Sequence, residues 1–152
     1  MHKLKGEILF HLAESVTFIK NLEGLSEDKW RAQIAENKWT VAEVVGHLIP
    51  WDEFLLNNRI PYLFSNDSLP AGPNEHEVNS KAALESRNSS KEDIIEKFIM
   101  VRLKLQEAIT DLNDELWNNE IEIGSTKISL FDYLQGFAQH DEHHFHQIKK
   151  VI

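Results

Sequence analysis

Apolar residues recur at helical spacing in four separate stretches of this chain. The first covers residues 4–22 and is followed by Gly24, a common helix stop. The others cover residues 41–55, residues 94–112 and a last stretch from residue 130 to about residue 150. Apolar positions three and four residues apart are typical of a helix that buries one face. The pattern therefore predicts an all-α fold, a four-helix bundle.

Capping signals mark three of the predicted helix starts. In the segment Thr40–Glu43 the hydroxyl and the carboxylate have the spacing of a capping box, in which each side chain bonds the other residue's backbone N–H. The segments Ser89–Glu92 and Ser129–Asp132 have the same spacing before the third and fourth helices. Pro50 lies inside the second stretch, so we expect either a kink near His47 or a helix boundary.

The connections between the helices differ in length. Residues 60–90 contain three of the four prolines and form the least regular part of the chain, with room for a short helix within Asn74–Arg87. This connection is long enough to cross the bundle, so the second and third helices can run parallel. The segment Glu120–Ser129 alternates around a Gly-Ser turn and predicts a small hairpin. We also expect a short helical turn in Ser26–Ala35, with Trp30 packed onto the core.

Composition narrows the classes of function. A length of 152 residues favours one domain, residues 1–152. The net charge of −9 argues against nucleic acid or an anionic membrane surface as a partner, because phosphate contacts need a basic face. No apolar run approaches the ~20 residues of a membrane span. The N-terminus lacks a secretory signal, so we expect a cytoplasmic protein. Cysteine is absent, so any metal ion must use nitrogen and oxygen ligands.

Three histidines carry the candidate chemistry. His140 and His144 stand one helical turn apart, which brings their Cβ atoms to roughly 5–6 Å and allows both imidazoles to bind one ion. His47, on the second predicted helix, would complete a three-ligand site with an open coordination position. The alternative is that the histidines are structural, because a single histidine at an apolar face usually is. Because four histidines occur within residues 140–146, a pair four residues apart also arises easily without a function.

Other catalytic motifs fit less well. His140-Asp141-x-x-His144 is similar to a zincin motif with aspartate in place of glutamate, but only eight residues remain downstream for a third ligand. Glu43 and His47 are four residues apart, whereas di-iron bundles use Glu-x-x-His pairs. No glycine-rich phosphate loop and no Gly-x-Ser-x-Gly elbow occurs.

Two segments together resemble the DinB/YfiT-like superfamily. They are Trp39–Leu48 and His140–Ile148, and the likeness extends over essentially the whole chain. The resemblance implies a bundle with up-down-down-up helix order, which suits the long second connection. It also implies a divalent metal ion held by three histidines, which match His47, His140 and His144. Members are often homodimers, so a homodimer is expected here.

The resemblance suggests an activity without fixing a substrate. Characterised members include S-transferases and a maleylpyruvate isomerase that use low-molecular-weight thiols, and others have been proposed as metal-dependent hydrolases. We therefore expect a metal-dependent transferase or hydrolase acting on a small molecule, with the ion as a Lewis acid on a bound thiol or water. Zinc, nickel, iron and manganese all accept imidazole ligands. The alternative is a non-catalytic, stress-related or ligand-binding helical dimer with a structural or vestigial metal site.

Three further side chains have two interpretations each. Asp141 lies within the apolar arc of the last helix. In the functional interpretation it orients a metal-binding imidazole or transfers a proton, and in the alternative it meets another polar group of the core. Arg102 is expected to be solvated, with binding of an anionic substrate as the alternative. His76, in the long connection, is expected at the surface, with closure of a pocket as the alternative.

Overall fold

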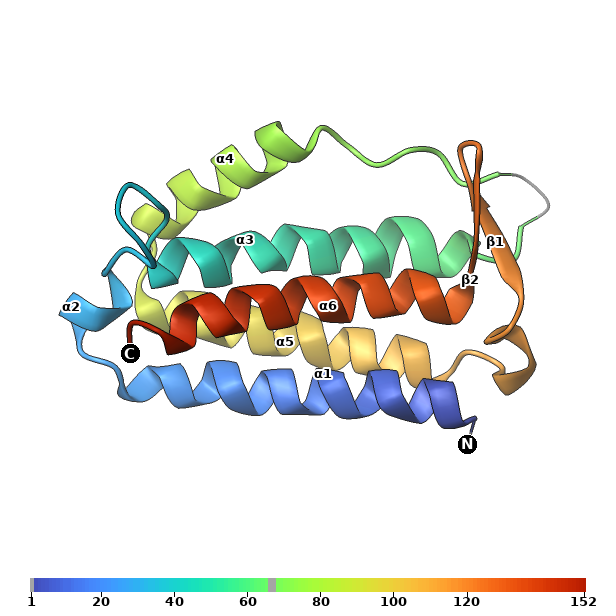
Figure 1. Cartoon of the computed structure of the whole chain (residues 1–152), viewed down its shortest axis with the longest axis horizontal. Helices are drawn as coiled ribbons and strands as arrows, with labels where there is room; N and C mark the ends of the chain where they lie inside the picture. The colour runs from blue at the N-terminus through green and yellow to red at the C-terminus, as the bar shows by residue number, and fades with distance from the viewer. Residues whose placement is uncertain (1, 66–67) are drawn as a thin grey trace.

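Four long helices form a bundle in the computed structural model, which describes residues 2–65 and 68–152. They are α1 (Lys3–Asn21), α3 (Val41–Phe54), α5 (Lys91–Thr110) and α6 (Leu130–Lys149). In Figure 1, α1 and α6 run in one direction, and α3 and α5 run in the other. The up-down-down-up order and the four-helix bundle are therefore as predicted. No described helix is both long and apolar enough to cross a membrane.

Hydrogen bonds at the helix starts explain where the helices begin. At α3 the Glu43 N–H donates to Thr40 Oγ1 at 3.2 Å, and the Thr40 N–H donates to Glu43 Oε1 at 3.4 Å, so the predicted capping box is present. Ser129 caps α6 as predicted, by accepting the Asp132 N–H at 3.1 Å.

The predicted cap of α5 was wrong by one residue. Ser90, not Ser89, caps the first turn of α5, because its hydroxyl accepts a hydrogen bond from the Asp93 N–H at 3.1 Å. The Ser89 hydroxyl instead donates to the Glu85 carbonyl at 2.8 Å, at the end of the preceding helix. Two adjacent serines followed by two acidic residues allow both registers, and the sequence pattern alone does not separate them.

Pro50 lies inside α3 and does not end it. The helix continues to Phe54 and is followed by a π-helical turn, Leu55–Arg59, and a short 3₁₀ turn, Ile60–Tyr62. Proline has no backbone N–H, so the carbonyl of Gly46, four residues earlier, loses its usual helical partner. Of the two outcomes expected at Pro50, a kink near His47 or a helix boundary, the boundary is absent.

Two apolar clusters form the core, one toward each end of the bundle. One surrounds the fully buried Trp30, which lies in α2 (Glu27–Trp30), as expected. The other lies beneath the hairpin of β1 (Glu120–Ile123) and β2 (Thr126–Ser129), which was also predicted. Buried polar side chains lie between the two clusters along all four long helices. They are Ser15, Asp52, Arg102 and Asp141.

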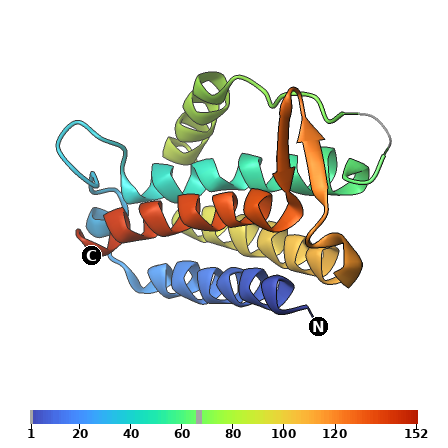
Figure 2. The same ribbon diagram turned by 45° about the vertical axis from the view of Figure 1, so that its right-hand side comes forward.

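The long connection is held at both of its ends. Leu69 pairs with the hairpin, because its N–H donates to the Glu122 carbonyl at 2.8 Å and its carbonyl accepts the Gly124 N–H at 2.9 Å. The expected short helix is present as α4 (Glu75–Arg87) and packs on α3. Both views show that α4 lies nearest to α3 at its C-terminal end and stands away at its start (Figures 1 and 2).

Glycine at position 46 allows this close approach of α4. A Cβ added at Gly46 would lie 1.8 Å from Ser86 Oγ and 3.0 Å from Ser86 Cβ. We expect Gly46→Ala to lower the free energy of unfolding by about 1–3 kcal/mol, because the added methyl overpacks this contact. Urea denaturation measures the change.

Two further variants test the explanation. Ser86→Ala removes the nearest atom and is expected to restore part of the stability lost in Gly46→Ala. Gly136→Ala, on α6, is the matched control, because a Cβ there meets nothing within 4 Å and alanine favours the helix. An unchanged urea midpoint for Gly46→Ala would contradict a tight contact between α3 and α4.

Candidate metal centre

The structure brings together the three histidines that the sequence singled out. His47 comes from α3, and His140 and His144 come from α6. One ring nitrogen from each of the three histidines lies within 4.8 Å of the corresponding nitrogens of the other two. His47 is buried, His144 is half-buried and His140 is exposed. The cluster therefore begins inside the bundle and opens toward its surface.

Hydrogen bonds fix which nitrogen each ring turns toward the cluster. The Nδ1 atom of His47 lies against the Val44 carbonyl, which can only accept, so we assign the proton of this ring to Nδ1. In the same way, His144 Nδ1 donates to Gln147 Oε1 at 2.8 Å. Both rings then leave Nε2 with a free lone pair, the form in which a neutral imidazole binds a metal ion.

The spacing of the nitrogens suits a shared ion. His140 Nε2 and His144 Nε2 are 3.1 Å apart. Two nitrogen ligands at ~2.0–2.1 Å from a tetrahedral ion are about 3.3 Å apart. Three imidazoles without a thiolate or carboxylate suit zinc, nickel, iron or manganese, and they leave a coordination position for water or a substrate. The residues present therefore fit a divalent metal ion.

Burial keeps the three rings in the neutral state that metal binding requires. The pKa of His47 is lowered to about 3, mainly by burial and in part by the neighbouring His144. Burial is also the main cause that lowers the pKa values of His140 and His144. At neutral pH a proton therefore does not compete with the ion for these lone pairs.

Arg102 lies beside the cluster in the centre of the bundle, which corrects the expectation that it is solvated. Its side chain is 1% exposed. The guanidinium makes two hydrogen bonds to Asp52, at 2.8 and 3.0 Å, and two to Asp141, at 2.7 and 3.3 Å. It also donates to Ser15 Oγ at 2.9 Å. Because its N–H groups already donate hydrogen bonds to buried side chains, Arg102 is not available to bind an anionic substrate.

The carboxylate of Asp141 is bonded to Arg102 and to another side chain of the core. Its Oδ2 atom lies 2.8 Å from His11 Nε2. Although burial opposes ionisation, Arg102 and the hydrogen bond from His11 together hold the pKa of Asp141 below its usual value. Asp141 follows His140 directly in the chain, so this network fixes α6 immediately beside a candidate ligand. These contacts agree with the alternative interpretation, in which Asp141 meets polar groups of the core, and its role as an outer partner of the metal site stays a prediction.

One cavity borders the cluster, and a second lies close to it. One, of about 420 Å³, is lined by His140 and by aromatic side chains that include Trp51 and Phe137. The other, of about 550 Å³, touches Trp39 and the exposed His76, so the surface position expected for His76 is observed. Both volumes lie in the range typical of small-molecule sites.

Glu75, at the start of α4, lines both cavities. Sequence reasoning did not single out this residue, because an acidic residue in the first turn of a helix is common for reasons of stability alone. Its place beside the histidines depends on how α4 packs against α3. No local sequence pattern indicates that packing.

Comparison with known proteins agrees with this architecture. A family model for the DinB superfamily matches residues 12–148. The chain belongs to the DinB superfamily. A search of the curated proteins finds no match.

Two solved structures resemble the chain. YfiT from Bacillus subtilis, "a probable metal-dependent hydrolase with an unusual four-helix bundle topology", matches with a TM-score of 0.79 at 17% identity, over 97% of this chain and 85% of YfiT. The mycothiol-dependent maleylpyruvate isomerase matches with a TM-score of 0.70 at 11% identity, over 95% of this chain and 60% of the isomerase. At these identities the likeness shows the fold alone.

If the three imidazoles hold an ion, removing either a buried or an exposed ligand must release it. We expect protein purified without a histidine tag to carry about one divalent ion per chain, and His47→Ala and His140→Ala to carry almost none. Elemental analysis measures the content, and circular dichroism checks the fold. His146→Ala is the matched control, because His146 is an exposed histidine of α6 outside the cluster. Full metal content in His47→Ala would exclude the three-histidine assignment.

Removal of the central cation tests the buried network. Arg102→Met leaves two buried carboxylates without their partner, and we expect it to cost about 3–5 kcal/mol of unfolding free energy in urea denaturation. Adding Asp52→Asn and Asp141→Asn removes the uncompensated charges and should recover much of this loss. A cost below about 1 kcal/mol for Arg102→Met would mean that the network does not hold the helices together.

Proposed function

We propose that this DinB-superfamily protein is a divalent-metal-dependent enzyme, of the hydrolase or thiol S-transferase type. The observation that carries the proposal is the convergence of three neutral imidazoles, from helices far apart in the chain, beside two cavities. His47, His140 and His144 would hold the ion. Zinc, nickel, iron and manganese are the candidates, and the donor set does not choose among them.

The protein's own residues prepare the site for this chemistry. A bound divalent ion would supply Lewis acidity, which lowers the pKa of a water or thiol beside it. His47 anchors the buried end of the site through the Val44 carbonyl, and Gln147 orients His144. Burial lowers the pKa values of all three rings, and the negative charge of Asp141 opposes that effect, so it supports their basicity toward a cation.

The names of the two similar solved structures support proposing these two reaction types. YfiT is named a probable metal-dependent hydrolase, and the isomerase is named as mycothiol-dependent. A low-molecular-weight thiol is therefore the proposed co-substrate of a transferase reaction, and water takes its place in a hydrolysis. We further propose that the protein is a cytoplasmic homodimer, as is frequent in the superfamily. Light scattering on the purified protein measures the dimer.

The activity can be tested with two simple probes. The first is the rate of thiol conjugation to monochlorobimane, and the second is the hydrolysis of p-nitrophenyl acetate. We expect at least one rate to fall by about 10²-fold or more on chelation and to return when metal is added, because loss of a Lewis acid removes several kcal/mol of transition-state stabilisation. His47→Ala and His140→Ala should show the same loss.

His146→Ala is again the control and should keep the wild-type rate. Activity that survives in His47→Ala would contradict catalysis at this site. If the protein contains stoichiometric metal but turns over neither probe with any small thiol, the non-catalytic alternative is favoured, a helical dimer whose metal ion is structural or vestigial.

A further inference from the structure

Glu75 lines both of the cavities near the histidine cluster. The cavity of about 420 Å³ touches both Glu75 and His140. The cavity of about 550 Å³ touches both Glu75 and Trp39, and the Trp39 ring packs on the His47 ring with centroids 4.9 Å apart. Glu75 therefore shares one cavity with His140 itself and the other with the ring that packs on His47.

The packing of α4 on α3 fixes the direction of this side chain. Asn79, one turn after Glu75, accepts a hydrogen bond from Trp51 Nε1 at 2.8 Å. Residues four apart share one face of a helix, so the face of α4 that turns Asn79 toward α3 also carries Glu75. Trp51 in turn lies one turn after His47 on α3. The face of α4 that carries Glu75 and Asn79 therefore turns toward the face of α3 that carries Trp51 and His47.

The carboxylate is close to the cluster but outside the ligand set. Burial lowers the pKa of His140, and the nearby charges of Asp141 and Glu75 oppose that effect. Glu75 is not part of the three-residue group whose ligand atoms lie within 4.8 Å of one another. It is exposed, and it forms no ion pair within residues 2–65 and 68–152. A free carboxylate in that position can accept a proton and release it to solvent.

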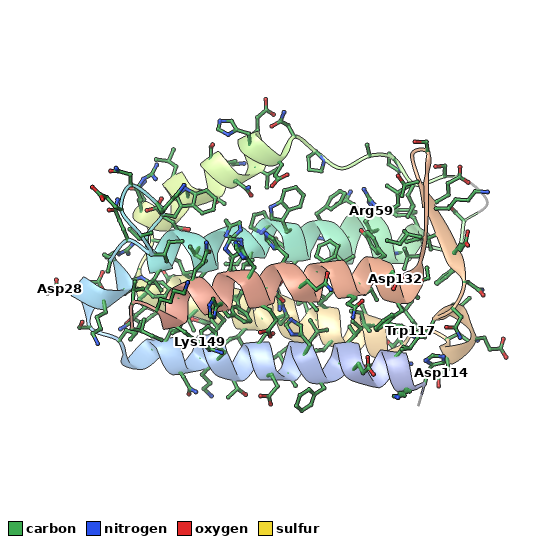
Figure 3. All side chains as sticks on the ribbon, viewed as in Figure 1. Asp28, Arg59, Asp114, Trp117, Asp132 and Lys149 are labelled. Carbon is green, nitrogen blue, oxygen red and sulfur yellow. The ribbon has the colours of Figure 1, made fainter. Side chains whose placement is uncertain are left out.

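Three other titratable side chains outside the histidine cluster line the same cavities and are less well placed. Asp132 and Tyr133 line the cavity of about 420 Å³, but they precede His140 by about two turns of α6, which is roughly 10–12 Å along the helix axis. Figure 3 shows Asp132 near the hairpin end of α6. His76 lines only the cavity of about 550 Å³, which touches none of the three histidines. Glu75 is the acidic side chain that lines both cavities.

We propose that Glu75 is the proton acceptor of this site. A carboxylate oxygen of Glu75 takes the proton from the O–H of a water or the S–H of a thiol held at the open side of the histidine cluster. The electron pair of the broken bond stays on oxygen or sulfur, which becomes the nucleophile, and a new O–H bond forms on Glu75. The inference rests on the proposed function, because it assumes a metal ion held by the three histidines.

The first experiment needs no substrate. In protein loaded with Co²⁺, the visible absorption spectrum reports ionisation of a solvent molecule beside the ion as pH rises. We expect Glu75→Gln to lower the apparent pKa of that transition by roughly 1 unit, because the negative charge of Glu75 disfavours the anionic product. Glu77→Gln removes the same charge from the same turn of α4, outside both cavities, and should leave the titration unchanged.

The second readout is the rate with the probe that the wild-type protein turns over. Glu75→Gln should reduce kcat by about 10²–10⁴-fold at unchanged metal content, the usual range for losing a general base. Glu75→Asp should recover part of the rate, and Glu77→Gln should keep all of it. The spectrum and the rate together separate proton acceptance from a merely nearby charge.

Each outcome decides a different claim. An identical Co²⁺ titration in wild type and Glu75→Gln overturns the inference while the metal site stands. A shifted titration with an unchanged kcat also overturns it, because Glu75 then acts only as a charge. A shifted titration in a protein that turns over neither probe supports the position of Glu75, and in that case the proposed function fails. A chain that binds no Co²⁺ contradicts both proposals.

Discussion

The buried ion network around Arg102 is the constraint on which the arrangement of this bundle depends. Its guanidinium, on α5, bonds Asp52 on α3, Asp141 on α6 and Ser15 on α1, so one side chain joins all four long helices. Taking charges out of water costs several kcal/mol each, and only close pairing offsets that cost. A rotation of α3 or α6 would break this pairing. The network therefore fixes how both helices face the interior, and with them the histidines they carry.

The histidine cluster and its cavities follow from this fixed frame and from the position of α4. His140 precedes Asp141 in the chain, and His47 lies five residues before Asp52. Position 46 has no side chain, so the end of α4 packs closely on α3. The start of α4 stands away, and the cavities near the cluster lie there. Rigid helices thus position the three candidate imidazole ligands, and Glu75 comes from a separate helix, α4.

Local sequence patterns predicted the elements but not the long-range polar contacts. Helical periodicity, the Thr40–Glu43 box and the Gly-Ser turn are short-range signals, and the helices, the cap of α3 and the hairpin agree with them. The spacing of the histidines singled out His47, His140 and His144, and the family resemblance supplied the helix order. The burial of Arg102 was missed because its partners lie 50 and 39 residues away in the chain. Glu75 was missed for a similar reason, since its role depends on the packing of α4 alone.

The central claim is that three imidazoles, distant in the sequence, hold one metal ion. X-ray absorption at the K-edge of zinc-loaded protein measures it directly. The account predicts three nitrogen neighbours at ~2.0–2.1 Å with the multiple-scattering pattern of imidazole rings, plus one further light atom. The His47→Ala protein, loaded in the same way, should show fewer imidazoles or no bound zinc. A shell made of oxygen atoms alone, or a spectrum that does not change in His47→Ala, would contradict the account.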